Sequence, residues 1–219
     1  MSYHLRVKIC GVTSEIDARQ AAQLGADAVG LNFYEGSPRC VGAGAAQCIV
    51  QELPPFVSAV GVFVDLPMRK VFEQVQALGR INIIQWHGKN RELSDCSPYH
   101  LIAAFPVRDA AGLQAIQRYV EMCRGLGRMP AALLLDGHAP GQHGGTGQTA
   151  PWHLLESFRP GVPIILAGGL TPDNIAEAVR LVRPYGVDVA SGVESAPGRK
   201  DAEKMRRFIA NAREAAARL

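Results

Sequence analysis

A thiol and a cation lie two residues apart at the end of the first apolar segment of the chain. Lys8 belongs to the segment 4–9, and Cys10 follows directly after it. Residues i and i+2 of a β-strand point to the same face, so these two side chains are expected to be neighbours. A nearby cation favours the thiolate, which is the reactive form of cysteine. The alternative is that Cys10 is simply a small core residue.

A carboxyl group, Asp136, follows a second apolar segment, 131–135. An acid at the end of such a segment is expected to be partly desolvated, which raises its pKa and suits a general acid. The next segment, 137–150, is long and rich in glycine, as a mobile lid would be. The alternative is that Asp136 caps a helix or a loop.

Two further polar residues, Arg39 and His87, also follow apolar segments. The planar fork of Arg39 can grip a carboxylate with two parallel hydrogen bonds. The alternative is a surface arginine. The six histidines show no H-E-x-x-H or similar spacing, so we expect no metal site.

Two glycine-rich turns occur late in the chain. Gly168 and Gly169 follow the apolar segment 163–167, and Ser191 and Gly192 follow the segment 187–190. Glycines let backbone N–H groups approach an anion, and a helix N-terminus adds a partial positive charge. Either glycine-rich segment alone could be explained by the need for a tight turn. The pair predicts a phosphate-binding site.

These residues must be positioned by alternating strands and helices. The apolar segments are short and continuously hydrophobic, which is typical of parallel strands covered on both faces. The longer segments between them have helical patterns. The predicted strands are 4–9, 27–33, 57–64, 81–86, 100–105, 131–135, 163–167 and 187–190, and the predicted helices are 14–24, 43–52, 67–78, 90–96, 109–124, 151–158, 172–182 and 201–217.

Eight strand–helix units in 219 residues predict an α/β fold, a compact (β/α)8 TIM barrel. The alternative is a doubly wound open sheet, which usually has a G-x-G-x-x-G turn after its first strand. That turn is missing here, and the glycine-rich turns come late. No linker divides the chain, so we expect one domain over residues 1–219. In a barrel, active sites lie at the C-terminal ends of the strands, where all these polar residues fall.

The composition limits the classes of partner. The hydrophobic content of 47% excludes a disordered chain, and a net charge of +3 argues against a dedicated nucleic-acid binder. Basic residues over 199–218 are interleaved with acids, which predicts a solvated helix face. No apolar run approaches the roughly 18–20 residues that span a bilayer, and the N-terminus has no signal-peptide layout. Five cysteines without a C-x-x-C pair indicate a reducing compartment, so we expect a cytoplasmic protein.

Short motifs place the chain close to a known family. From about residue 5 to 210 it resembles the phosphoribosylanthranilate isomerases of tryptophan biosynthesis. The motifs occur in the family's order and are together specific. They are K-I-C-G-V-T (8–13), G-A-D-A-V-G (25–30), F-Y…S-P-R (33–39), V-G-V-F (60–63), Q-x-H-G (85–88), L-D (135–136), G-G-T-G (144–147), L-A-G-G-L (166–170) and V-D-V-x-S-G-V-E (187–194).

The resemblance implies a (β/α)8 barrel that converts N-(5′-phosphoribosyl)anthranilate into 1-(2-carboxyphenylamino)-1-deoxyribulose 5-phosphate, an Amadori rearrangement. It implies that Asp136 is the general acid at the furanose ring oxygen and Cys10 the general base at C2′. Arg39 would meet the anthranilate carboxylate.

The resemblance also implies the surroundings of the reaction. It implies that the substrate phosphate binds to the loops that contain Gly168, Gly169, Ser191 and Gly192. It also implies that His87 and Asp188 line the pocket. It implies no cofactor. The expected partner is a phosphorylated small molecule, with neither nucleic acid nor membrane, and the expected state is a monomer, with a homodimer as the alternative.

Two other functions remain possible. One is a related phosphate-binding barrel enzyme such as indole-glycerol-phosphate synthase, whose chemistry calls for Lys and Glu at strand ends. Among the lysines, only Lys8 falls in a predicted strand. The other is a silent barrel that binds phosphate without turnover. A silent relative would have no chemical need to keep Cys10, Asp136 and Arg39 together.

Overall fold

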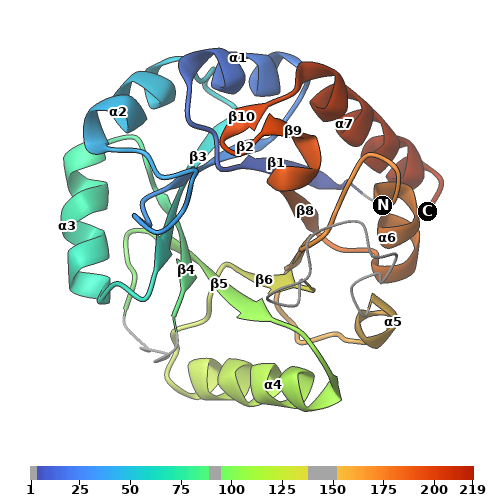
Figure 1. The fold of residues 1–219 in the computed structure, drawn as a ribbon. Coiled ribbons are helices and arrows are strands. Elements are labelled where there is room, and N and C mark those ends of the chain that lie inside the picture. Colours follow the sequence, from blue (N-terminus) through green and yellow to red (C-terminus); the bar gives the residue numbers. More distant parts are fainter. Residues whose placement is uncertain (1–3, 89–94, 138–151) are drawn as a thin grey trace.

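Eight parallel strands close into a barrel, and helices cover its outer surface (Figure 1). The computed structural model describes residues 4–88, 95–137 and 152–219. Each strand pairs with the next, and β8 pairs with β1, so the predicted barrel is confirmed and the open sheet is excluded. The strands are β1 (Arg6–Cys10), β2 (Ala28–Asn32), β3 (Ser58–Val64), β4 (Ile83–His87), β5 (His100–Pro106), β6 (Ala132–Asp136), β7 (Ile164–Ala167) and β8 (Gly186–Val189).

The helices follow the predicted positions with some differences. The prediction for 90–96 falls largely on 89–94, outside the described residues, and residues 95–96 are not helical. In the described part of the chain, no helix is long and apolar enough to cross a membrane. The helices are α1 (Glu15–Gln23), α2 (Ala43–Gln51), α3 (Met68–Leu78), α4 (Ala110–Gly125), α5 (Trp152–Leu155), α6 (Ile175–Val182) and α7 (Ala202–Ala217).

Helix α6 begins three residues later than the sequence predicts, at Ile175 instead of residue 172. The side chain of Asn174 accepts a hydrogen bond from the backbone N–H of Thr171 at 2.8 Å, which closes a turn before the regular helix. The helix N-terminus is therefore farther from the glycine pair of the preceding loop than we expected.

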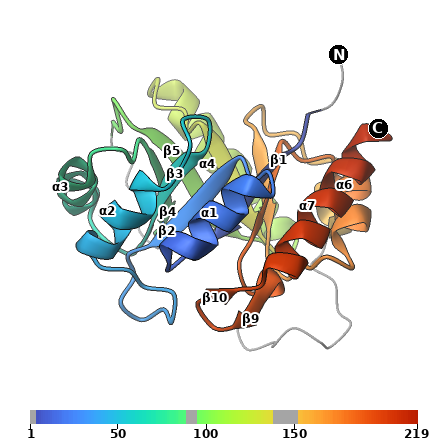
Figure 2. The same cartoon turned by 90° about the horizontal axis from the view of Figure 1, so that it is seen from above.

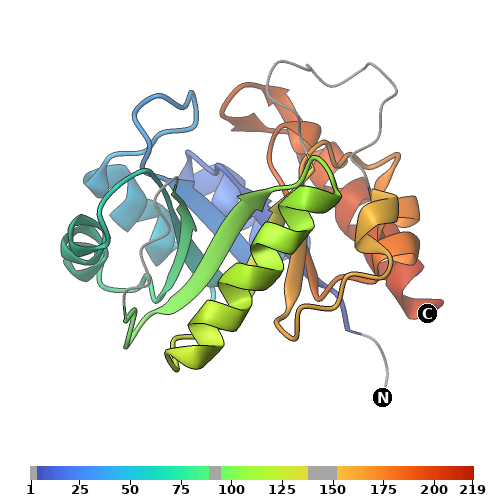
Figure 3. The same cartoon turned by 90° about the horizontal axis from the view of Figure 1, so that it is seen from below.

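A small feature after β8 was not predicted. The 3-10 turn η1 (Ser191–Val193) leads into a two-stranded antiparallel sheet of β9 (Glu194–Ala196) and β10 (Arg199–Lys200). Figures 2 and 3 show this sheet at the end of the barrel opposite the chain termini. Lys200 in β10 is only 5% exposed. The prediction of a solvated face over 199–218 is therefore wrong at this residue, and Lys8 is not the only lysine in a strand.

The strands bury both of their faces, in two separate layers. Residues such as Val7 and Ile9 point outward into the core between barrel and helices. The barrel interior holds a smaller cluster that includes Val60, Leu134 and Ile165. Because side chains alternate along a strand, the residues between the outward-facing positions must face the interior. This alternation decides which polar residues line the mouth of the barrel.

The layer between barrel and helices should dominate stability. Phe208 of α7 is fully buried in this layer. We expect Phe208→Ala to lower the free energy of unfolding by about 3–5 kcal/mol, through lost burial and the cavity left behind. Phe56→Ala is the matched control, since Phe56 is 97% exposed, and it should stay within about 0.5 kcal/mol of the parent. Denaturant unfolding measures both. Equal effects would contradict this account of the core.

Candidate active site

Polar, inward-facing residues end several strands at one mouth of the barrel. Cys10, Asn32, His87 and Asp136 are the last residues of β1, β2, β4 and β6. Their preceding neighbours point outward into the helix layer, so these four take the inward positions. The closed strand order places β6 three positions from β1, by way of β8 and β7. Cys10 and Asp136 therefore face the mouth from different sides.

One layer deeper, a buried ion pair connects β1 and β8. Lys8 Nζ donates to Asp188 Oδ1 at 2.8 Å, and the two side chains are 6% and 8% exposed. A buried charge is tolerated when it is paired, which explains why both residues occupy the barrel interior. A Cβ atom at Gly30 would lie 2.8 Å from Cys10 Sγ and 2.9 Å from Lys8 Nζ. Glycine at this position leaves room for the thiol and the ammonium side by side.

The ion pair changes what Lys8 does to the thiol. Burial raises the pKa of Cys10, and the charge of Asp188 raises it further. The charge and hydrogen bond of Lys8 lower this pKa but do not outweigh the other two, so the pKa of the free thiol is raised. The sequence predicted the direction of the Lys8 contribution, and the net shift of the thiol pKa has the opposite direction. Asp188 offsets the cation, and its charge was missing from that prediction.

His87 is neutral at pH 7. Burial and the nearby charge of Lys8 lower the pKa of His87 to about 4, against opposing charges on Asp188 and Asp65. Its Nε2 lies 2.9 Å from the amide nitrogen of Gln85, which precedes it by two residues on the same strand face. His87 is therefore suited to hydrogen bonding and not to proton transfer near pH 7.

Arg39 reaches the mouth from the loop after β2. The side chain of Asn32 donates to Ser37 Oγ at 3.2 Å, and Ser37 Oγ accepts from the backbone N–H of Arg39 at 3.1 Å. A Cβ atom at Gly11 would lie 2.5 Å from Arg39 Cδ, so the arginine packs directly on the residue after Cys10. Its guanidinium is bound by Glu194 through two hydrogen bonds of 2.8 and 2.6 Å. Arg39 is therefore held in one orientation by Glu194.

Glu194 and Lys200 belong to the same cluster, and sequence reasoning missed them. Lys200 Nζ donates to Glu194 Oε1 at 2.7 Å, and both side chains are buried. The pair with Arg39 joins residues 155 positions apart. The only available signal was a carboxylate closing the V-D-V-x-S-G-V-E motif, and that signal does not identify its partner.

The two late glycine turns lie against each other. Gly168 and Gly169 have φ angles of 89° and 65°, in the left-handed region that favours glycine. A Cβ atom at Gly192 would lie only 1.9 Å from the carbonyl oxygen of Leu170. Glycine at 192 thus lets η1, which begins at Ser191, pack against the β7–α6 loop. The backbones of the two late glycine turns are therefore in direct contact.

Among residues 4–88, 95–137 and 152–219, no three or more His, Cys, Asp or Glu side chains are grouped so as to hold a metal ion. The predicted lid, 137–150, lies outside the described residues beyond residue 137.

Comparison with known proteins identifies the family. A sequence profile described as N-(5′-phosphoribosyl)anthranilate (PRA) isomerase matches residues 7–211. The chain belongs to this family. The N-(5′-phosphoribosyl)anthranilate isomerase of Geobacter metallireducens is 48% identical over 210 residues, which cover 95% of this chain and 99% of that protein. That of Pseudomonas putida is 43% identical over 208 residues, covering 94% and 96%.

Solved structures agree with the sequence comparison. Phosphoribosyl anthranilate isomerase from Thermotoga maritima superposes with a TM-score of 0.85 at 36% identity, covering 96% of this chain and all of that one. A phosphoribosyl anthranilate isomerase in complex with reduced 1-(o-carboxyphenylamino)-1-deoxyribulose 5-phosphate gives a TM-score of 0.82 at 35% identity, with the same coverage. The sequence and structure comparisons therefore agree on the fold and the family.

The electrostatics of Cys10 can be tested by alkylation at different pH values. We expect the rate of Cys10 labelling to rise with pH along a titration whose midpoint lies above that of an ordinary thiol. Asp188→Asn removes a negative charge that disfavours the thiolate, so the midpoint should move down. Cys40→Ala/Cys48→Ala is the suitable background, since these thiols are more exposed than Cys10.

The control for this experiment is Asp95→Asn, which removes an exposed carboxylate. It should leave the midpoint of Cys10 labelling unchanged. A midpoint that stays in place or rises in Asp188→Asn would show that Asp188 does not set the thiol pKa.

Proposed function

We propose that Cys10 and Asp136 are the general base and the general acid with which this protein isomerises N-(5′-phosphoribosyl)anthranilate, the reaction of its family in tryptophan biosynthesis. The placement of the two residues supports these roles. Each ends a strand, each takes an inward position, and they face one barrel mouth from different sides. A substrate held between them can be protonated at one atom and deprotonated at another.

In the first step, Asp136 protonates the furanose ring oxygen. The C1′–O bond then breaks, and the nitrogen lone pair forms the C1′=N bond of a cationic imine. The apolar segment that leads to Asp136 limits its contact with water, and the side chain is only partly exposed. A partly desolvated carboxyl group holds its proton to higher pH than one in water.

In the second step, Cys10 acts as the thiolate, after its own proton has passed to solvent, and removes the proton from C2′. The electron pair of the C–H bond forms a C1′=C2′ bond, the imine nitrogen becomes neutral, and tautomerisation of the enol gives the ketone product. The raised pKa of the free thiol is compatible with this order of events. Ring opening creates a cation beside Cys10, and an adjacent positive charge lowers a thiol pKa at the stage that needs thiolate.

Binding groups hold the two ends of the substrate. The phosphate would rest on the backbone of the Gly168–Gly169 and Ser191–Gly192 turns, which lie against each other. Arg39, beside Cys10, would bind the anthranilate carboxylate. His87 and Asp188 would line the floor of the pocket, with His87 as a neutral hydrogen-bonding group.

The setting of the reaction is part of the same proposal. A phosphorylated small molecule is the only partner that the mechanism needs, and acid–base chemistry needs no cofactor. All proposed catalytic and binding residues lie in a single barrel domain, so the proposed site needs no residue from a second copy of the chain. Five free cysteines support a reducing, cytoplasmic location.

Asp136→Asn tests the acid role directly. The amide cannot donate a proton to the ring oxygen, so kcat should fall about 10²–10⁴-fold while the fold is kept. Loss of anthranilate fluorescence on freshly prepared substrate measures turnover, and an unfolding midpoint checks the fold. Asp95→Asn is the control and should retain parental kcat. A loss below about tenfold in a folded Asp136→Asn protein would remove Asp136 from this role.

Arg39→Lys tests carboxylate recognition. Lysine keeps the charge but cannot present two parallel N–H donors, so we expect product affinity to fall about tenfold or more. Titration with the reduced product analogue measures this affinity. Arg19→Lys is the control, because Arg19 also makes a forked contact, with Glu52, on the outer surface. Equal affinity of the Arg39→Lys and parent proteins would mean that Arg39 does not bind the carboxylate.

A further inference from the structure

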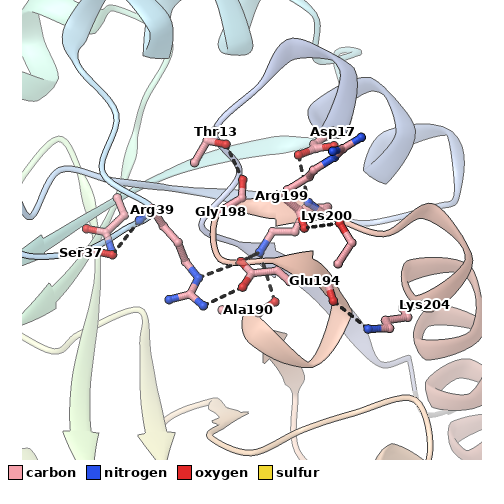
Figure 4. A network of polar contacts seen from close by, with 12 residues as sticks. Thr13, Asp17, Ser37, Arg39, Ala190, Glu194, Gly198, Arg199, Lys200 and Lys204 are labelled. Carbon is pink, nitrogen blue, oxygen red and sulfur yellow. Dashed lines mark hydrogen bonds and ion pairs between the residues drawn. The ribbon is translucent and has the colours of Figure 1, made fainter.

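The guanidinium of Arg39 is fixed by a buried ion cluster (Figure 4). Arg39 Nε and Nη2 donate to the two carboxylate oxygens of Glu194 at 2.8 and 2.6 Å. Lys200 Nζ donates to Glu194 Oε1 at 2.7 Å and to the carbonyl oxygen of Ala190 at 3.1 Å. The side chain of Lys200 is 0% exposed, that of Glu194 4% and that of Arg39 22%. The arginine is thus the only member of this trio with substantial solvent access.

The edge that Glu194 uses determines which edge stays available. A guanidinium has five N–H donors in one plane, and Glu194 engages the side that carries Nε and Nη2. It does not engage Nη1, so the end-on edge formed by Nη1 and Nη2 can meet a second carboxylate in the same plane. Because Glu194 is buried and bound on both oxygens, the orientation of that end-on edge is fixed before substrate arrives.

The charge balance of the cluster requires Lys200. Arg39 paired with Glu194 alone would be neutral and would attract an anion only weakly. Lys200 adds a second cation to the same carboxylate, so the protonated trio carries one net positive charge. Burial lowers the pKa of Lys200, and the hydrogen bond and charge of Glu194 oppose this shift. Burial alone would raise the pKa of Glu194, but the hydrogen bonds from Arg39 and Lys200 lower it, so Glu194 stays ionised.

The backbone around the cluster is held as well. Asp17 Oδ2 accepts from the backbone N–H of Lys200 at 3.2 Å, and Lys204 Nζ donates to the backbone oxygen of Glu194 at 2.7 Å. Thr13 Oγ1 donates to the carbonyl oxygen of Gly198, in the turn between β9 and β10, at 2.6 Å. The small sheet after β8 is therefore anchored to α7 and to the β1–α1 segment, which gives Glu194 and Lys200 a fixed place.

We propose that Glu194 and Lys200 are positioning residues that make Arg39 selective for a carboxylated substrate. Glu194 orients the guanidinium so that its end-on edge faces the carboxylate, and Lys200 prevents Glu194 from cancelling the charge of Arg39. This inference rests on the proposed role of Arg39. It adds two residues that do not touch the substrate and act only through the arginine.

Two ligands isolate the contribution of the carboxylate. One is reduced 1-(o-carboxyphenylamino)-1-deoxyribulose 5-phosphate, and the other is the same molecule with a phenylamino group in place of the carboxyphenylamino group. The charge of Lys200 also lowers the pKa of Cys10. Neither ligand reacts, so this effect on Cys10 does not enter the measurement. The measured quantity is the ratio of the dissociation constant of the second ligand to that of the first. We expect a ratio of about 10–100 for the parent protein.

Glu194→Gln and Lys200→Met should each lower this ratio about tenfold, towards one, while affinity for the ligand without the carboxylate stays close to the parent value. Glutamine offers one acceptor oxygen, and its NH2 group would face an N–H donor of Arg39. It therefore cannot accept both hydrogen bonds of the Arg39 guanidinium. The direction of the change in Glu194→Gln separates orientation from charge. Removing the negative charge of Glu194 without a loss of orientation would raise the ratio of the two dissociation constants. Lys200→Gln, which keeps a donor but loses the charge, serves if the methionine variant does not fold.

Controls separate positioning from a general structural role. In an Arg39→Ala background, Glu194→Gln should cause no further change in the ratio. Lys70→Met, at an exposed lysine of α3, should leave the ratio unchanged.

An unchanged or higher ratio in Glu194→Gln, an unchanged ratio in Lys200→Met, or a further drop in the Arg39→Ala background would each overturn the inference. In the first two cases a high parental ratio that depends on Arg39 would leave the proposed function intact. A parental ratio near one would overturn the role of Arg39 together with the inference.

Discussion

The buried ion pair between Lys8 and Asp188 is the interaction on which the chemistry of the barrel mouth depends. Neither charge is tolerable alone in the barrel interior, which contains a cluster of apolar side chains, because an unpaired buried charge is costly. The pairing brings the end of β8 and the middle of β1 into one electrostatic unit. Cys10 and His87 both respond to its two charges, and the thiol pKa rises while His87 stays neutral. Lys8 therefore donates a hydrogen bond to the Cys10 thiol, while Asp188, the partner of Lys8, raises the thiol pKa.

Sequence periodicity was sufficient for the barrel and for the strand ends. The short apolar segments predicted all eight strands, and the polar residues that end them lie at the mouth because alternation along a strand is a local property. Which charged side chains pair with each other was not predictable from the sequence, since Lys8 and Asp188 are 180 residues apart and Arg39 and Glu194 are 155 residues apart. The small β9–β10 sheet was missed because strands of two or three residues carry no periodic signal. For the same reason Lys200 was assigned to a solvated helix face.

Close packing at glycine joins parts of the mouth that the strands alone would leave separate. Arg39 lies on Gly11, directly after Cys10, and the contact at Gly192 brings η1 onto the β7–α6 loop. In each case a Cβ atom would meet another group at 2.5 Å or less, so a larger residue would push a binding group away from the mouth. Glycine in these motifs therefore has two functions. It allows left-handed backbone at Gly168 and Gly169, and it allows close packing at Gly11 and Gly192.

Among the described residues, two buried ion clusters lie at the mouth, and they differ in net charge. Lys8 with Asp188 is neutral as a pair, which lets a thiol and an imidazole keep their uncharged forms beside it. Arg39, Glu194 and Lys200 together keep a positive charge, and the member with solvent access is the arginine. Buried ion pairs seldom add much stability compared with apolar packing, because desolvation offsets their attraction. What they supply is fixed orientation and a fixed sign of charge. In the proposed mechanism, the Arg39 cluster would supply a positive fork for the substrate carboxylate, and the Lys8–Asp188 pair would keep the surroundings of Cys10 and His87 neutral.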